Sequence, residues 1–149
     1  MSSEEETFRR LVVELRILEG TAEALQSRIN LVNAALAELS VANMTLEGLE
    51  AEKKEASLVV PIGGGSYIEA TLRGADKVIV GVGAGVAIEK TIKEAKENLE
   101  NRLSNLEKTR TSLHQQLTQV VDKIGDHRAQ LEEMTAKLRR EQAKSVRKT

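Results

Sequence analysis

The sequence predicts a mainly helical α+β protein, in which a long antiparallel two-helix coiled coil is joined by two β-hairpins. Apolar residues recur in heptads at both ends of the chain, whereas the only proline and seven of the ten glycines lie between residues 57 and 88. The net charge is −5 over residues 1–56 and +4 over residues 89–149. We therefore expect a first coiled-coil helix (1–56), an assembly segment of hairpins (57–88) and a second coiled-coil helix with a basic tail (89–149).

The two helices are predicted by apolar residues that alternate at steps of three and four, as in a coiled-coil seam. In the first helix the apolar seam residues are Phe8, Leu11, Leu15, Leu18, Ala22, Leu25, Ile29, Val32, Leu36, Leu39 and Leu46. In the second they are Leu103, Leu106, Leu113, Leu117, Val120, Ile124, Leu131, Met134 and Leu138. Opposite net charges favour pairing of the helices with each other. We interpret the polar seam residues Arg110 and His127 as setting the register, with pH sensing or partner contact as the alternatives.

The segment between the helices is predicted to form two β-hairpins. Residues 58–62 and 67–72 flank the turn at 63–66, and residues 77–82 and 86–88 flank the turn at 83–85. Two hairpins cannot enclose a stable core alone, and their open edges favour pairing with other subunits. The candidate assembly residues are Leu58, Val60, Ile62, Ile68, Leu72, Val78, Ile79, Val80, Val82, Val86 and Ile88.

The residue inventory argues against an enzyme. The chain has no cysteine, and its two histidines, 13 residues apart on one helix, would lie about 20 Å from each other, too far for one metal ion. The glycine run at 81–85 has Val86 where a dinucleotide fingerprint needs its third glycine. Because no nucleophile, base and orienting group can be assembled, we expect no catalytic residue, no cofactor and no metal.

The chain is expected to be soluble and cytoplasmic. It has no run of 18 apolar residues and no signal peptide, and the absence of cysteine suits a reducing compartment. The basic tail from Lys137 has no aromatic residue to stack on a base. We therefore favour a solvated helix end, or one that attracts an acidic protein, over binding of nucleic acid.

Apolar residues near the free ends of the two helices are the candidate binding surface. The hairpin of helices has no cap there, so that fraying exposes apolar area to water. The candidates are Phe8, Leu11, Val12, Val13, Ile17, Leu131, Met134 and Leu138. Val13, Ile17 and Leu31 also form an apolar stripe off the seam, which is either a second functional surface or ordinary scattered exposure.

This organisation resembles the alpha class of the prefoldin family (GimC), and the archaeal form above all. Residues 77–90, followed by Glu94 and Ala95, are similar to the family's glycine turn, its Val-Glu-Lys strand end and its Glu-Ala pair; Ile88 replaces the usual valine. Residues 58–63 resemble the family's first strand and turn. This specific similarity covers about residues 58–99, whereas the helices match by heptad alone.

The resemblance implies a chaperone subunit in a hexamer of two alpha and four beta subunits, whose hairpins join into β-barrels. Members of the family hold unfolded polypeptides at their coiled-coil tips without ATP and deliver them to a group II chaperonin. Arg139 and Arg140 are the candidate chaperonin contacts. The resemblance implies neither nucleic acid nor membrane as a partner. The alternative is a structural coiled-coil scaffold or tethering subunit that binds no client.

Overall fold

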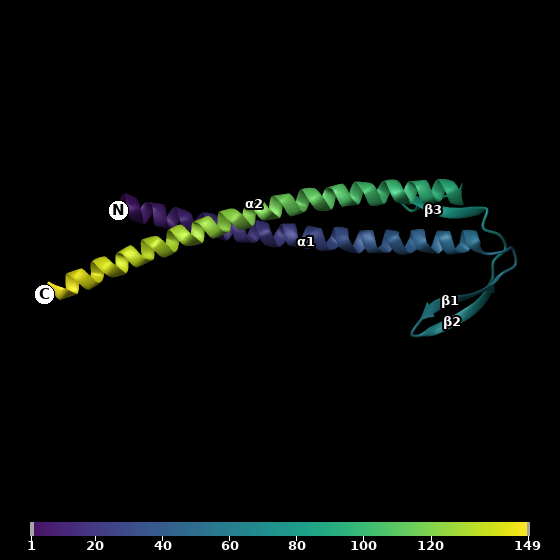
Figure 1. Cartoon of the computed structure of the whole chain (residues 1–149), viewed down its shortest axis with the longest axis horizontal. Coiled ribbons are helices and arrows are strands. Elements are labelled where there is room, and N and C mark those ends of the chain that lie inside the picture. The colour runs from purple at the N-terminus through teal and green to yellow at the C-terminus, as the bar shows by residue number, and fades with distance from the viewer. Residues whose placement is uncertain (1, 149) are drawn as a thin grey trace. The chain divides into compact units, whose positions relative to one another are not determined.

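The computed structural model describes residues 2–148. A long helix precedes two β-hairpins in the chain, and a second long helix follows them (Figure 1). Helix α1 (Ser3–Ala51) is followed by β1 (Ser57–Gly63), β2 (Ser66–Thr71), β3 (Lys77–Gly83), β4 (Val86–Thr91) and helix α2 (Ile92–Arg147). The predicted fold class, mainly helical α+β with two hairpins, is confirmed. Residues 1 and 149 of the expected helical segments lie outside the described residues.

The chain folds into two compact units. The terminal unit combines the chain up to Asn33 with the chain from Thr109 onward, and the central unit spans Ala34–Lys108. Each unit contains a stretch of α1 and a stretch of α2. The hairpins belong to the central unit.

Each helix begins at a side-chain cap. Ser2 Oγ accepts a hydrogen bond from the backbone N–H of Glu5 at 3.2 Å, and Thr91 Oγ1 accepts one from the N–H of Glu94 at 3.2 Å. A Ser or Thr followed three residues later by Glu is the pattern of a capping box. The first turn of α1 is also acidic, which the partial positive charge of a helix N-terminus favours.

The boundaries of the hairpin segment differ from the expected ones. Strand β4 continues to Thr91, so α2 begins at Ile92 and not at residue 89. The reason is that Thr91 pairs with Lys77 in the ladder while its side chain caps the helix. Helix α1 ends at Ala51, before the expected residue 56, because the chain reverses at Glu55 (φ 68°), whose N–H already donates to the carbonyl of Leu72.

Most of the buried side chains of the two units are predicted seam residues. In the terminal unit Leu25, Ile29 and Leu113 form a core, against which Val32, Leu117 and Val120 pack. Ile29 is the most buried of them, with 1% of its surface exposed. In the central unit the buried apolar residues are Leu36, Leu39, Ile92, Ala95 and Leu99. The heptad pattern therefore identifies the buried positions of α1 and of α2 in the terminal unit, whereas Ile92, Ala95 and Leu99 precede the seam predicted for the second helix.

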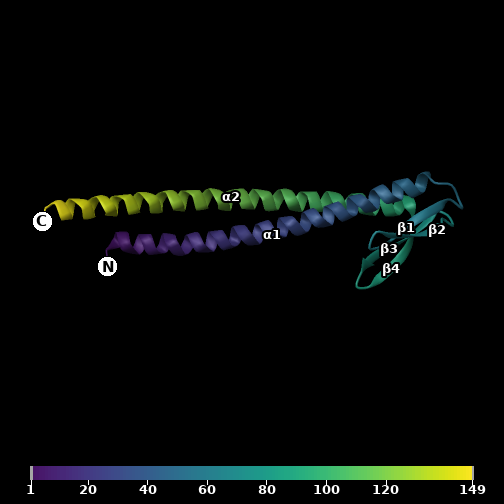
Figure 2. The ribbon, with the colours of Figure 1, turned by 90° about the horizontal axis from the view of Figure 1, so that it is seen from below.

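The two hairpins follow one plan, displaced by 20 residues, and form two separate two-stranded antiparallel sheets (Figure 2). Ser57 pairs with Thr71 in the first as Lys77 pairs with Thr91 in the second, and each ladder has its irregularity just before the turn. The central turn residues have positive φ in both: Gly64 and Gly65 in one, Ala84 (51°) and Gly85 in the other. Such two-residue turns match the twist of paired strands.

The sequences of the hairpins carry the same repeat. At an offset of 20 residues, six of the fifteen aligned positions from Ser57 to Thr71 are identical: Val60/Val80, Gly63/Gly83, Gly65/Gly85, Ile68/Ile88, Glu69/Glu89 and Thr71/Thr91. Pro61 corresponds to Gly81. The hairpins are therefore two versions of one unit that differ at a few positions.

Helix α1 carries apolar residues on a second face. Large apolar side chains that are exposed on it are Val13, Ile17, Leu31, Val41 and Met44, of which the sequence analysis named the first three. Within residues 2–148, α1 is the one helix that is long and apolar enough to cross a membrane by length and composition alone. Core helices of soluble proteins pass the same test, and α1 buries its seam against α2 within each unit.

Truncation of the seam residue Ile29 to alanine is expected to lower the free energy of unfolding by about 2–5 kcal/mol, because the side chain is fully enclosed. Leu31→Ala, on the same helix but 72% exposed, should change the free energy by no more than about 0.5 kcal/mol. Urea unfolding followed by helical circular dichroism measures both. Equal losses of unfolding free energy in the two variants would contradict the assignment of Ile29 to the buried seam.

Candidate functional site

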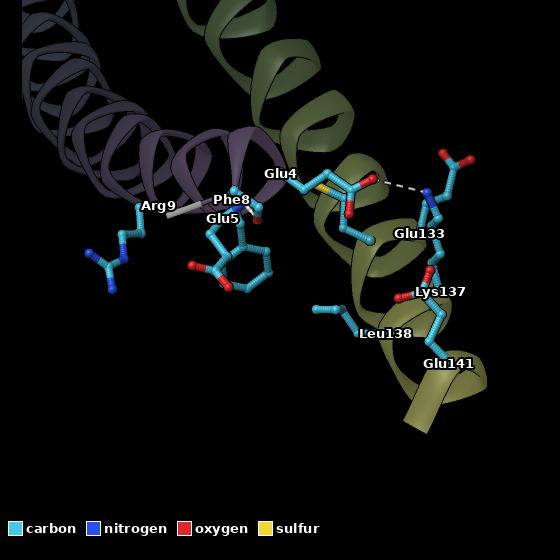
Figure 3. A pocket seen from close by; sticks show the side chains of 10 residues that line it. Glu4, Glu5, Phe8, Arg9, Glu133, Lys137, Leu138 and Glu141 are labelled. Atoms are coloured by element: carbon cyan, nitrogen blue, oxygen red, sulfur yellow. Dashed lines mark hydrogen bonds and ion pairs between the residues drawn. The ribbon is translucent and has the colours of Figure 1, made fainter. Parts of the chain in front are cut away.

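The ends of α1 and α2 in the terminal unit enclose an open recess of about 570 Å³ (Figure 3). Its apolar lining consists of Phe8 from α1 and Met134 and Leu138 from α2. Polar and charged residues complete it: Ser2, Glu4, Glu5, Arg9, Glu133, Lys137 and Glu141. The structure therefore brings three of the eight predicted client-binding residues into one concave surface.

The other five predicted client-binding residues do not line this recess and differ in exposure. Val13 and Ile17 are exposed on the outer face of α1, and Val12 and Leu131 are half-buried. Leu138 is 49% exposed. Leu11, which the sequence analysis also named as a candidate, is only 5% exposed. As a seam residue it is enclosed by the paired helices and takes part in the core.

A salt bridge closes one side of the recess. Lys137 Nζ lies 3.1 Å from Glu4 Oε1, drawn as a dashed line in Figure 3. The hydrogen bond to Glu4 raises the pKa of Lys137, and the charges of Glu4 and Glu141 add to this shift. The apolar lining of the recess therefore has charged residues beside it, two of which form a salt bridge.

Further pairs connect the acidic first helix with the basic second one. In the terminal unit, Glu14 contacts His127 at 2.8 Å and Glu19 contacts Arg128 at 2.9 Å. In the central unit, Lys96 contacts Glu50 at 3.0 Å, and this hydrogen bond raises the pKa of Lys96. The sequence analysis gave only the net charges. Charged residues beside the seam positions are visible in the sequence. Which of them pair across the two helices depends on the register, which the sequence analysis did not establish.

His127 occupies a seam position with acceptors on both sides of its ring. Nδ1 lies 2.9 Å from the carbonyl oxygen of Lys123, and Nε2 lies 2.8 Å from Glu14 Oε2. A carbonyl and a carboxylate both accept, so two good hydrogen bonds require the doubly protonated ring. The bond to Glu14 accordingly raises the pKa of His127 against the opposing effect of desolvation. Arg110, the other polar seam residue, points its Nη1 at Asn33 Oδ1, 3.5 Å away.

The predicted assembly residues on the hairpins lie largely in the open. Ile79 is 75% exposed, and Val60, Ile62, Ile68, Val82, Val86 and Ile88 are exposed as well. Leu58, Leu72, Val78 and Val80 are half-buried. The sequence analysis missed Val59 and Tyr67, which are equally exposed. Both lie on the face of the hairpin that carries Glu69, which the alternation of apolar and polar residues predicted to be polar. Both faces of the first hairpin therefore carry large apolar side chains.

Within residues 2–148, no group of three or more His, Cys, Asp or Glu residues could hold a metal ion. The functional features are instead surfaces: a recess at the helix ends and hairpins with apolar groups on the outside. Hairpins without a core of their own, carried on a coiled coil, define a subunit of a larger assembly.

The comparisons with known proteins specify the family. The family model for a prefoldin subunit matches residues 18–143, and the chain belongs to the prefoldin family. It is 33% identical over 132 residues to prefoldin subunit alpha of Methanobrevibacter smithii, covering 89% of this chain and 90% of that one. It is therefore a chaperone subunit of the alpha-class kind.

Solved structures agree with this assignment. The chain is similar to the filamentous prefoldin of Methanocaldococcus jannaschii, with a TM-score of 0.67, 28% identity and coverage of 77% of this chain and 95% of that chain. It also shares the fold of the prefoldin beta subunit from Thermococcus strain KS-1, with a TM-score of 0.57, 15% identity and coverage of 85% and 90%.

The His127–Glu14 pair predicts a pH dependence of stability. Because the pKa of His127 is raised on folding, the stabilisation is complete below its ordinary value of about 6.5 and is lost as the pH rises through the raised pKa. The temperature of the unfolding midpoint should therefore decrease as the pH is raised above about 6.5. In Glu14→Gln this fall should be smaller. A fall of equal size in both proteins would contradict the contribution of the pair.

Proposed function

We propose that this chain holds unfolded polypeptides at the recess of its terminal unit, without ATP, as the alpha subunit of a cytoplasmic prefoldin. The main support for this proposal is the recess itself, where apolar side chains of both helices are partly exposed at the helix ends. Unfolded chains expose apolar segments of no fixed sequence. A shallow surface with a flexible Met and a Leu suits such clients.

The apolar area at one recess is small, so binding to a single subunit is expected to be weak and readily reversed. Several recesses on one assembly would raise the effective concentration and retain a large client. Such an assembly is the hexamer of two alpha and four beta subunits that the resemblance to the prefoldin family implies, in which the hairpins complete β-barrels with their neighbours. The exposed apolar residues of both hairpins support it, since a lone hairpin leaves them in water.

The recess is tested with Phe8→Ser, Met134→Ser and Leu138→Ser combined, in a complex with a beta-class subunit. Light scattering of a chemically unfolded test protein, diluted without ATP, should be suppressed by the wild-type complex and much less by this variant. Leu31→Ser is the matched control, since it removes an exposed apolar residue elsewhere on α1. Size-exclusion chromatography checks that each complex assembles.

Removal of residues 1–13 and 131–149 extends the same test. Intact assembly with loss of suppression would support the proposal. If a well-assembled wild-type complex suppresses no scattering, the holding function is wrong and the structural scaffold becomes the better description.

We further propose that Arg139 and Arg140 contact the group II chaperonin that receives the client. Both are exposed near the end of α2, where Lys137, Lys144 and Arg147 add positive charge. Exposed charge of one sign accelerates encounter with an acidic surface and is screened by salt.

The double variant Arg139→Glu/Arg140→Glu should weaken chaperonin binding several-fold at low ionic strength while suppression of scattering stays at the wild-type level. Surface plasmon resonance against a group II chaperonin at two salt concentrations measures this. Unchanged binding at low salt would exclude these two residues as contacts.

A further inference from the structure

The lining of the recess at the helix ends carries an unequal number of charges of the two signs. Four of the lining residues are acidic and two are basic. The acidic ones are Glu4, Glu5, Glu133 and Glu141, and the basic ones are Arg9 and Lys137. The apolar side chains of the recess are therefore surrounded by an excess of negative charge.

Lys137 lies among three of these carboxylates. Its Nζ is 3.1 Å from Glu4 Oε1, while Glu133 precedes it and Glu141 follows it by one helical turn. Glu133, Lys137 and Glu141 follow one another along one side of α2 (Figure 3). The hydrogen bond to Glu4 raises the pKa of Lys137, and the charges of Glu141 and Glu133 raise it further. One positive charge therefore faces three negative charges.

The other basic residues near the helix ends do not balance this excess. Arg9 lies on the far side of Phe8 from the residues of α2 (Figure 3). Arg139 and Arg140 are exposed on α2 and do not line the recess. Lys137 makes its salt bridge with Glu4, so the carboxylates of Glu133 and Glu141 remain open to a cation from outside.

The carboxylates of α2 border the apolar contacts directly. Glu133 precedes Met134 in the chain, and Leu138 extends from α2 toward the side of Phe8 (Figure 3). Neighbouring residues of a helix are turned by about 100° from each other, so an acidic and an apolar side chain that adjoin in sequence open onto adjacent parts of the surface. A polypeptide that covers the apolar residues thus brings its own flanking residues next to the carboxylates.

We propose that the recess selects apolar client segments that have lysine or arginine beside their apolar residues. The apolar side chains of the client cover Phe8, Met134 and Leu138, and its ammonium or guanidinium group pairs with Glu133 or Glu141. This rests on the proposed function and names the kind of segment that the recess takes. Charge complementarity decides the choice, because an acidic segment would bring like charges together and an uncharged one would leave the carboxylates unpaired.

The preference is expected to be modest and sensitive to salt. Ion pairs at an exposed surface contribute little individually, so two of them should favour a basic segment over an acidic one by about threefold to tenfold. Salt screens such pairs, whereas the contact between apolar groups is not weakened by it. The preference should therefore decrease as the ionic strength rises, while apolar binding persists.

Methionine methyl groups provide a signal from the recess and an internal reference. Met134 lines the recess, whereas Met44 belongs to the central unit and is 69% exposed. The chain is labelled with carbon-13 at its methionine methyl groups and combined with an unlabelled beta-class subunit. Three short peptides that share one apolar core, flanked by lysine, glutamine or glutamate, are then titrated into this complex. The shift of the Met134 signal gives the affinity of each peptide for this recess.

The lysine-flanked peptide should bind about threefold to tenfold more tightly than the glutamate-flanked one at low salt, with the glutamine-flanked peptide between them. The Met44 signal should stay where it is. Equal affinities of the three peptides, or tighter binding of the glutamate-flanked one, would overturn the preference while the holding function stands. If no peptide shifts the Met134 signal, the recess is not a client site, and the proposed function fails together with this inference.

Variants of single charges test which carboxylates are responsible. Glu133→Gln should reduce the preference for the lysine-flanked peptide, and Glu133→Gln/Glu141→Gln should abolish it. Glu132→Gln is the matched control, because it removes the same charge from the adjacent exposed position of α2, which does not line the recess. A preference that survives in the double variant, or one that Glu132→Gln reduces as much as Glu133→Gln does, would contradict the assignment.

Lys137→Gln provides a test in the opposite direction. Removal of this cation frees Glu4, so the lysine-flanked peptide should bind about twofold more tightly than to the wild type. A gain of affinity cannot result from a damaged fold. Weaker binding of the lysine-flanked peptide to Lys137→Gln would contradict pairing of the client with these carboxylates.

Discussion

The burial of one apolar row of α1 against one apolar row of α2 is the interaction on which the other features depend. Ile29, Leu25 and Leu113 are removed from water in the terminal unit, as are Leu36, Leu39 and Leu99 in the central unit. A helix with a single apolar row gains little from intrinsic propensity in water, so its stability comes from this packing. The cross-helix pairs of Glu14 and Glu19 add direction and register more than energy, since exposed ion pairs contribute little.

Because the seam takes up the core, the hairpins have none. Each is a two-stranded sheet with exposed apolar side chains, an arrangement that is marginal by itself in water. Duplication of one hairpin plan doubles the available edges, and Pro61 and Gly81 then make those edges chemically different.

The seam also explains the recess at the helix ends. Phe8, Met134 and Leu138 continue the apolar rows to a place where few neighbours remain to enclose them. Glu4 and Lys137 close the rim with a salt bridge. The surface is thus a core left incomplete, which accounts for its apolar character and its openness.

The two helices, the two hairpins and the seam could be predicted from the amino-acid sequence, because heptad spacing and glycine turns are local properties of the chain. It also placed Phe8, Met134 and Leu138 correctly at the helix ends. Three other facts are visible only in the folded chain: Leu11 is enclosed, His127 lies against Glu14, and residues of β3 line an apolar groove. These facts depend on which residues of one helix or strand oppose those of another. The register of the helices arises from packing between segments about a hundred residues apart, and that of the strands depends on the bulge before each turn. Periodicity within one segment does not specify which residues of another segment lie opposite.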